Sequence, residues 1–301
     1  MNTDKVYFIL GCTACGKAAV GRELAMRLNA RILSVDSMKI YRRMNIGTAT
    51  PSAETQKLIR HYAVDVVEPC DSYSVAQFVQ CADAAVDECR RDGKICLAVG
   101  GTSLYIKALT EGLFEGPSAD ENIRNELRAT AAGLGGIEEL YRRLCAADPE
   151  SAERIHRNDE KRVIRALEVF IQTGVPISRL QKQWDAGRKR LDCTLIGLRR
   201  DKDVQSRRIN ARVRKMVDMG LRDEVVSLLA EEKPLSPQAA QAVGYAEVID
   251  HLAGKYDWEH AVEQIKINTR RLAKKQRTWH RRWRDVVWFD MDEDEPAQVT
   301  T

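Results

Sequence analysis

The sequence lacks any run of about 18 consecutive apolar residues, which excludes a membrane-spanning helix. The apolar stretch at residues 6–10 is too short for a secretory signal peptide, so we expect a cytoplasmic protein. The chain also has little excess of charge of either sign, since 48 Lys and Arg against 44 Asp and Glu leave a formal net charge of +4. That balance excludes a histone-like nucleic-acid binder but allows a local basic face. A length of 301 residues predicts two domains.

Metal-ligand spacings are scarce as well. Eight cysteines are spread along the chain, and only Cys12 and Cys15 form a C-x-x-C pair. A zinc site of this kind needs a second pair, so we expect none, and we expect reduced thiols. By itself the single pair is weak support for a metal or redox role.

The first hundred residues alternate between strand and helix patterns. Continuous apolar runs at 6–10, 31–35 and 95–99 predict buried strands. A helix is predicted from about Lys17 to Leu28, and Ser74 caps a longer amphipathic helix that stops at Gly93. Repeated units of this kind predict a parallel sheet with helices on both faces, and therefore an α/β fold.

The pattern changes at about residue 113. Up to residue 192 only helical segments are predicted, for example Asp120–Ala132, Ile137–Ala146 and Glu160–Thr173. Strand patterns return at Cys193–Leu198 and Val286–Phe289, with a long helix at Trp258–Trp283 and a frayed acidic tail from Asp290. We therefore predict an α/β core, residues 1–112 and 193–301, interrupted by an inserted all-helical domain, residues 113–192.

A glycine-rich loop of the pattern G-x-x-x-x-G-K follows the first predicted strand. It consists of Gly11, Cys12, Thr13, Ala14, Cys15, Gly16 and Lys17. In such a loop, backbone N–H groups and a helix N-terminus surround phosphate oxygens, and the lysine reaches the distal phosphates. The loop predicts a P-loop NTPase-like core that binds a diphosphate or a nucleotide such as ATP. Ala18 stands where the pattern has a Ser or Thr ligand for Mg²⁺, so no metal ligand is certain.

Polar residues follow two other predicted strands. Asp36 and Ser37 come after residues 31–35, and Gly100, Gly101 and Thr102 come after residues 95–99. The carboxyl ends of parallel strands share one edge of the sheet, where ligands bind. Capping of the next turn is a simpler explanation for either group alone. Together with the phosphate loop, however, they predict an enzyme site.

Six segments resemble one known family, the tRNA dimethylallyltransferases (tRNA isopentenyltransferases). The segments are GCTACGKA at 11–18, similar to GPTASGKT; DSMKIYRRMNIGTATP at 36–51, similar to DSMQVYRGMDIGTAKP; VGGTSLYIKAL at 99–109, similar to VGGTGLYI; NDEKRVIRALEV at 158–169, similar to NDxQRVxRALEV; QAVGYAE at 241–247; and TRRLAKKQRTW at 269–279. They span nearly the whole chain in the family's order. No zinc-finger spacing follows them, which resembles the bacterial form.

The resemblance implies a prenyltransferase that moves a dimethylallyl group from dimethylallyl diphosphate to the exocyclic amine of the tRNA adenosine 3′ of the anticodon. By this resemblance Asp36 is the general base, Thr102 makes a hydrogen bond within the catalytic site, and Arg212 and Lys17 neutralise the leaving diphosphate. Mg²⁺ is the implied cofactor. An allylic diphosphate ionises more easily when positive groups stabilise the negative charge on the leaving diphosphate. A positioned carboxylate makes the amine a better nucleophile by accepting its proton. We expect a monomer.

The resemblance also implies a set of tRNA-binding residues. They are Asp36, Ser37, Met38, Lys39, Thr102, Arg124, Lys161, Arg162, Val163, Ile164, Arg165, Gln241, Gly244, Tyr245, Lys274, Lys275, Gln276, Arg277, Thr278, Trp279, His280 and Arg281. Basic residues with interleaved tryptophans suit phosphate binding and base stacking, although a solvated helix face with core tryptophans gives the same pattern.

Four positions depart from the family pattern, namely Ala18, Lys39, Thr50 and Ser103. Lys39 replaces a Gln near the adenosine pocket, and a lysine can only donate hydrogen bonds where an amide also accepts them. Two alternatives therefore stay open. One is a divergent paralogue that binds tRNA with weak or altered prenyl transfer, and the other is a P-loop small-molecule kinase that uses ATP. Such a kinase needs Mg²⁺ on the transferred phosphate, which Ala18 disfavours.

Overall fold

The computed structural model describes residues 2–114, 116–182 and 190–292. Contacts between Cα atoms divide the chain into two compact units. The core unit comprises Met1–Thr110 and Arg190–Thr301, and the helical unit comprises Glu111–Lys189. The boundaries predicted from the sequence, 112/113 and 192/193, lie within three residues of these.

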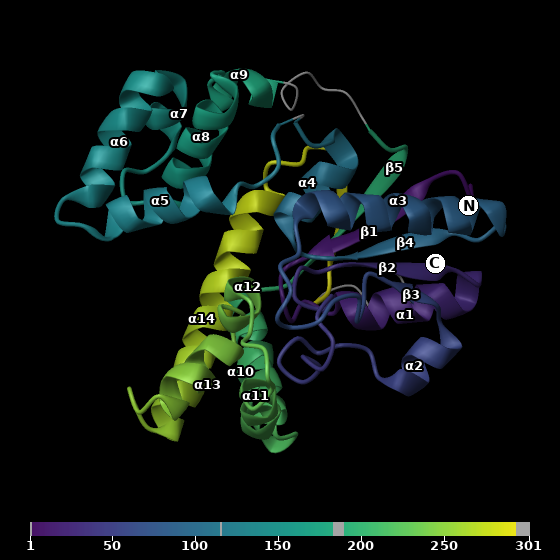
Figure 1. The fold of residues 1–301 in the computed structure, drawn as a ribbon. Helices are drawn as coiled ribbons and strands as arrows, with labels where there is room; N and C mark the ends of the chain where they lie inside the picture. Colours follow the sequence, from purple (N-terminus) through teal and green to yellow (C-terminus); the bar gives the residue numbers. More distant parts are fainter. Residues whose placement is uncertain (1, 115, 183–189, 293–301) are drawn as a thin grey trace. The chain divides into compact units, whose positions relative to one another are not determined.

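The core unit contains a six-stranded sheet in which every strand pairs with its neighbours in parallel (Figure 1). The strand order is β3-β2-β4-β1-β5-β6. The strands are β1 (Val6–Gly11), β2 (Arg31–Val35), β3 (His61–Tyr62), β4 (Cys96–Gly100), β5 (Cys193–Arg199) and β6 (Val286–Asp290). The predicted α/β fold with a parallel sheet is confirmed.

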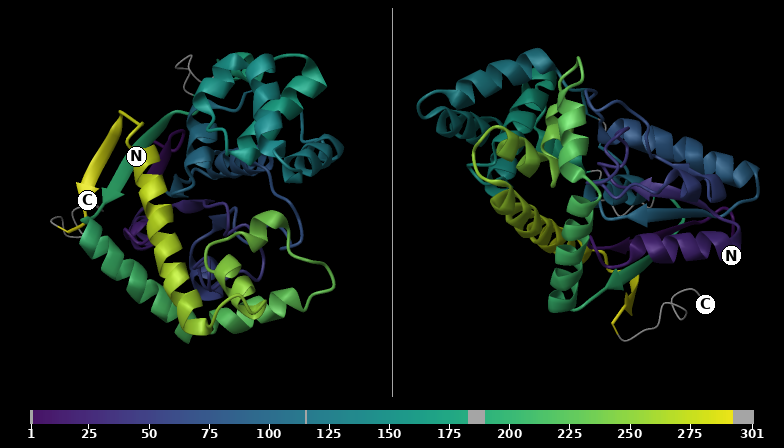
Figure 2. Two further views of the ribbon diagram at one scale, coloured as in Figure 1. Left: turned by 90° about the vertical axis from the view of Figure 1, so that its left-hand side faces the viewer. Right: turned by 90° about the horizontal axis from the view of Figure 1, so that it is seen from below.

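Helices of the core unit follow the strands or gather after β5. They are α1 (Lys17–Leu28), α2 (Ala53–Leu58), α3 (Val75–Arg91), α4 (Ser103–Glu111, ending at the unit boundary), α10 (Lys202–Asp218), α11 (Leu221–Leu229), α12 (Pro237–Ala240), α13 (Tyr245–Leu252) and α14 (Trp258–His280). The two further views show α14, in yellow, running beside α10 and α13 (Figure 2), and both pairs are in contact.

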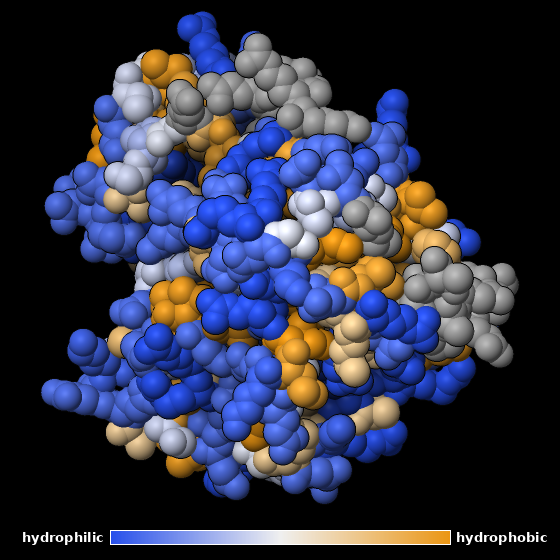
Figure 3. All heavy atoms as spheres, turned by 90° about the vertical axis from the view of Figure 1, so that its right-hand side faces the viewer, coloured by the Kyte–Doolittle hydropathy of each residue, from blue (hydrophilic) through white to orange (hydrophobic). Residues whose placement is uncertain are grey.

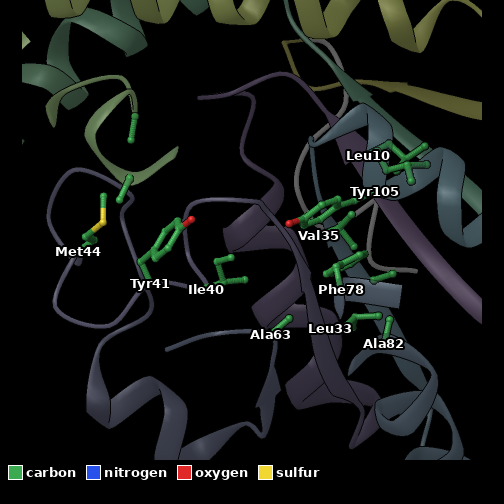
Figure 4. Packing of buried hydrophobic residues seen from close by; sticks show 14 of the residues in the cluster. Leu10, Leu33, Val35, Ile40, Tyr41, Met44, Ala63, Phe78, Ala82 and Tyr105 are labelled. Carbon is green, nitrogen blue, oxygen red and sulfur yellow. The ribbon is translucent and has the colours of Figure 1, made fainter. Parts of the chain in front are cut away.

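The strand residues alternate between two buried faces of the sheet. Leu10 and Leu33 face the larger cluster, which Phe78 of α3 and Tyr105 of α4 join (Figure 4). Their rings are stacked, with centroids 3.8 Å apart. Ile9, one position away, faces the opposite cluster formed with α1. A period of two along strands buried on both faces is the arrangement that a parallel sheet covered by helices requires.

Local signals explain several helix ends. Ser74 and Gln77 form a capping box at the start of α3. Gly174, with φ of 69°, ends the helix α8 (Glu160–Thr173) in the left-handed conformation that glycine adopts without strain. The long helix ends at His280 rather than at the predicted Trp283. The expected fraying from Asp290 is wrong for its first residues, because Asp290 belongs to β6 and Asp292 pairs with Arg200 at 2.6 Å; the rest of that tail lies outside the described residues.

The helical unit consists, where the structure describes it, of helices around their own apolar core. They are α5 (Glu121–Ala132), α6 (Gly136–Ala147), α7 (Pro149–Arg154), α8 (Glu160–Thr173) and α9 (Ile177–Gln181). Glu168 of α8 is fully buried and accepts from Arg124 at 2.9 Å and from Arg165 at 2.7 Å. Asp120 N, at the start of α5, donates to the same carboxylate at 2.8 Å. A buried carboxylate therefore joins α5 to α8.

The face shown in Figure 3 is mainly hydrophilic, with hydrophobic side chains exposed in patches between the polar ones. No helix within residues 2–114, 116–182 and 190–292 is long and apolar enough to cross a membrane.

Candidate phosphate and nucleobase site

The phosphate loop connects β1 to α1 at the edge of the sheet where β2 and β4 also end. Leu10, Val35 and Gly100 are aligned by strand pairing, so the residues that follow them share this edge. Gly11 has φ of 150°, and a Cβ there would lie 2.5 Å from the Leu198 carbonyl oxygen. Only glycine fits between β1 and β5 at this point. The sheet therefore brings together the three groups of residues that the sequence placed at strand ends.

Three side chains from residues 200–208 hold carbonyl groups of the phosphate loop. Gln205 donates to Thr13 O at 2.9 Å and Arg208 Nε donates to Ala14 O at 3.0 Å, both from α10. Arg200 Nε donates to Cys15 O at 3.0 Å. No local sequence pattern predicts these contacts. They fix the loop backbone so that its N–H groups keep their directions.

Gln276 of α14 joins the phosphate loop to the turn after β4. Its side chain accepts from Thr13 N at 2.8 Å and donates to Gly101 O at 3.0 Å. A Cβ at position 101 would lie 2.6 Å from Gln276 Nε2, so this close approach requires glycine. The neighbouring Arg277 donates to Gln205. Two of the residues predicted to bind tRNA are therefore directed at the phosphate loop.

Lys17, at the first position of α1, folds back onto the loop. Its Nζ donates to Cys12 O at 2.7 Å and lies 3.8 Å from Cys15 Sγ. Both cysteines are buried, and burial raises the pKa of the Cys12 thiol. The ammonium group is thus held at the loop, where a phosphate oxygen would bind.

Asp36 and Thr102 lie beside each other at the ends of β2 and β4. The Thr102 hydroxyl accepts from Ser37 N at 3.1 Å, and Asp36 Oδ1 accepts from Met38 N at 3.0 Å. Gly101 N and Thr102 N both donate to Val35 O at 3.2 Å. These bonds tie the two turns together and orient the carboxylate.

Two half-buried cations face the Asp36 carboxylate. Burial lowers the pKa of Lys39, and the positive charges of Arg212 and Lys17 lower it further. The negative charge of Asp36 acts in the opposite direction and raises this pKa. Burial likewise lowers the pKa of Arg212, and Asp36 opposes it. Lys39 and Arg212 together outweigh the single charge of Asp36, and this excess of positive charge favours an anionic ligand.

Arg212 is placed by the loop that follows Lys39. Its guanidinium donates to Thr48 O at 3.4 Å. Glu224 of α11 holds this loop by accepting from Asn45 N at 2.9 Å and Ile46 N at 2.8 Å. Tyr245, also predicted to bind tRNA, is fully buried and donates to Glu224 at 2.6 Å. Tyr245 therefore supports the loop rather than presenting its ring to solvent.

The other predicted tRNA-binding residues fall into exposed and buried groups. Exposed in the core unit are Gln241, Lys274, Lys275, Thr278 and Arg281, and exposed in the helical unit are Lys161 and Arg162. Buried are Val163, Ile164, Gly244 and His280. Met38, Trp279, Arg124 and Arg165 are partly exposed, and both arginines pair with Glu168. Helical periodicity explains the division, because successive residues of a helix face different sides.

The residue after Lys17 differs from the metal-binding Ser or Thr of the phosphate-loop pattern. Ala18 is exposed in the first turn of α1 and offers no oxygen ligand. Within the part of the chain that the structure describes, no group of three or more His, Cys, Asp or Glu side chains could hold a metal ion.

One depression lies between α10 and α14, and a second adjoins it at the ends of β5 and α14. A basic groove of about 420 Å³ is lined by residues including Lys202, Arg270 and Lys274. A cavity of about 660 Å³, which shares Lys202 with it, reaches Cys12 and Cys15 and is also lined by His280. This cavity, called here the loop cavity, gives access to the phosphate loop from the β5 side of the sheet.

The fold and the site define an α/β protein in which a glycine-rich loop of the phosphate-binding pattern and the Asp36 carboxylate lie at one edge of a parallel sheet. Residues 39–283 match the family model described as IPP transferase. The tRNA dimethylallyltransferases of Thermotoga maritima and Geobacter metallireducens are 42% and 41% identical to this chain, over 98% and 95% of it and 95% and 92% of their own lengths.

A solved structure, the full-length tRNA isopentenylpyrophosphate transferase from Bacillus halodurans, is similar with a TM-score of 0.71 and 38% identity. The match covers 98% of this chain and 93% of that one. The chain belongs to the IPP transferase family, and the resemblance found in its sequence is confirmed.

Proposed function

We propose that this protein transfers a dimethylallyl group from dimethylallyl diphosphate to the exocyclic amine of the tRNA adenosine immediately 3′ of the anticodon. Relatives named tRNA dimethylallyltransferase match nearly the whole chain, which supports the reaction. The observation that carries the assignment of residues is the convergence of the phosphate loop, Asp36 and Thr102 on one edge of the sheet.

The diphosphate binds at the phosphate loop. Backbone N–H groups, Lys17 and Arg212 stabilise the negative charge that develops when the bond between the allylic carbon and the diphosphate oxygen breaks. Lys39, facing the same space, adds a cation that this chain has in place of the family's Gln. We infer that Lys39 binds a phosphate oxygen, since an ammonium group cannot accept a hydrogen bond from an adenine amine.

Asp36 acts on the nucleophile. An aromatic amine attacks poorly, so a carboxylate that accepts its proton as the new C–N bond forms raises its reactivity. The bond from Met38 N orients the carboxylate, and Thr102 holds the adjoining turn. To reach this position the adenosine leaves the stack of the anticodon loop.

Mg²⁺ enters this proposal as a partner of the diphosphate rather than as a resident ion. Mg²⁺ often keeps several waters and binds mainly through substrate phosphates, so the diphosphate and water can supply most of its ligands while Asp36 serves as the base. The phosphate loop also suits a nucleotide such as ATP. The enzyme acts as a monomer in the cytoplasm. The exposed basic residues of α14, together with Lys161 and Arg162 of the helical unit, supply tRNA contacts.

The test is transfer of labelled dimethylallyl diphosphate to an unmodified tRNA that carries adenosines at the last anticodon position and the next, with and without Mg²⁺. Label is expected in the second adenosine. Asp36→Asn keeps the oxygen that caps Met38 N but removes the base, so turnover should fall about 10²–10⁴-fold. Binding of tRNA, measured by filter retention, should change by less than about threefold.

Asp87→Asn, on the exposed side of α3, is the matched control and should leave turnover unchanged. Full activity of Asp36→Asn would contradict the assignment of the base. Binding of tRNA without label in the wild type would favour the divergent paralogue. Turnover of ATP with a small acceptor and no RNA would favour the kinase.

A further inference from the structure

The C-x-x-C pair lies inside the phosphate loop, and the reaction proposed above does not use its thiols. Cys15 N donates to Cys12 O at 3.3 Å, so the four residues form a turn closed by a backbone hydrogen bond. The Cα atoms at the ends of such a turn are within about 7 Å of each other, which overlaps the separation of roughly 4.4–6.8 Å that a disulfide spans. Both thiols are free in this structure.

A small reagent can reach this pair although neither residue is exposed at the surface. Cys12 and Cys15 are 8% and 1% exposed, and both line the loop cavity of about 660 Å³. Cys89 of α3 and Cys96 of β4 are also buried and interact with each other, but they do not line this cavity. Access distinguishes the two pairs of thiols.

Lys17, the proposed phosphate ligand, contacts the Cys15 sulfur atom and the Cys12 carbonyl oxygen. Lys17 Nζ lies 3.8 Å from Cys15 Sγ and donates to Cys12 O at 2.7 Å. Thr13, between the two cysteines, is fixed through both its N–H and its carbonyl group by Gln276 and Gln205. A covalent bond across Thr13 and Ala14 would strain these bonds and redirect the loop N–H groups on which phosphate binding depends.

We propose that Cys12 and Cys15 form a reversible disulfide when a peroxide enters the loop cavity, and that this disulfide prevents diphosphate binding. The peroxide oxidises the Cys15 thiol to a sulfenic acid and releases one water. The Cys12 sulfur then attacks the Cys15 sulfur, the S–O bond breaks, and a second water leaves with the Cys12 proton. A dithiol reductant restores both thiols by exchange. The effect on prenyl transfer rests on the proposed function, whereas the disulfide does not.

The experiment treats the full chain with hydrogen peroxide and maps its cysteines after alkylation and trypsin digestion. Cleavage after Lys5 and Lys17 isolates both thiols in one peptide, residues 6–17, without any other cysteine. We expect this peptide to lose two hydrogen atoms, and binding of inorganic diphosphate to weaken at least about tenfold. Treatment with dithiothreitol should reverse both changes.

Cys15→Ser and Cys12→Ala are each compared with their own untreated form, so a change in their basal activity does not matter. Both should lose the response to peroxide, while Cys145→Ser, exposed in the helical unit, should keep it. A reduced peptide 6–17, a disulfide formed by Cys89 and Cys96 instead, or unchanged diphosphate binding by the oxidised protein would overturn the proposal. Because the mapping and the diphosphate titration need no tRNA, they decide it even if the protein transfers no prenyl group.

Discussion

His280 shows at the scale of one residue how burial sets a pH response. The side chain is 2% exposed, and within the described residues neither ring nitrogen has a hydrogen-bond partner. Burial, and then Lys17, lowers the pKa of His280 to about 4 from an ordinary 6.5. Because the unfolded chain binds this proton more readily, stability is lost as the pH falls from about 6.5 to 4.

We expect the free energy of unfolding to fall by about 2–3 kcal/mol more in the wild type than in His280→Phe between pH 7 and pH 4.5. Phe has a similar size and does not titrate. Urea unfolding at the two pH values measures the difference, and other titrating groups cancel in the comparison. Equal pH dependence of the two proteins would show that His280 gains a proton in the folded state as easily as in the unfolded one.

The sequence placed some site residues better than others, for a physical reason. Asp36 and Gly11 follow apolar runs, so local patterns sufficed to put them at the end of parallel strands. The contacts of Thr13 with Gln205 and Gln276 join residues 192 and 263 positions apart and leave no local pattern. His280 was grouped with its exposed basic neighbours, although the helical period relates it to the buried Ala273.

At the scale of secondary-structure elements, Glu168 decides how α5 and α8 are joined. Glu168→Gln removes a fully buried negative charge and leaves Arg124 and Arg165, both about a quarter exposed, without their counter-charge. We expect this to destabilise the helical unit by about 2–4 kcal/mol, less than a wholly buried network would lose. Hydrogen exchange of α5 and α8 in the full chain measures the change.

Glu121→Gln is the matched control, since Glu121 pairs with the same Arg124 at 3.2 Å but is 61% exposed. Its cost should be below about 1 kcal/mol, because solvent screens the pair. Equal protection of α5 and α8 in both variants would mean that hydrophobic packing alone joins these helices.

The bounds of helices and strands are predicted well where the apolar pattern extends over many residues. The predicted bounds of α1, β2 and α8 agree with the structure, because each carries several turns or a continuous apolar run with a clear end. The four-residue α12 and the two-residue β3 were missed. Segments this short contain less than one full pattern, and tertiary packing determines them.

At the scale of the whole molecule, a net charge of +4 conceals an uneven distribution. Exposed basic residues gather at the C-terminal end of α14, while the ion pairs of the helical unit neutralise several of its arginines. Uniform attraction of the whole protein to RNA would respond equally to the loss of any exposed cation. A localised tRNA interface responds only to cations that lie within it, because solvent screens charges more than about 10 Å away at moderate salt.

The salt dependence of tRNA binding separates these two cases. Replacing Lys274, Lys275 and Arg281 with Gln should reduce the slope of log affinity against log salt by about 2–3, since each phosphate contact contributes roughly 0.7–0.9. A matched triple variant with Gln at Arg22, Lys57 and Arg91 removes the same charge from exposed positions on α1, α2 and α3. If both variants changed the slope equally, binding would depend on total charge, and α14 would not form the interface. The two variants have the same net charge, so a smaller slope in the α14 variant alone cannot come from total charge. It would mean that the RNA phosphates contact α14 and release their counterions there.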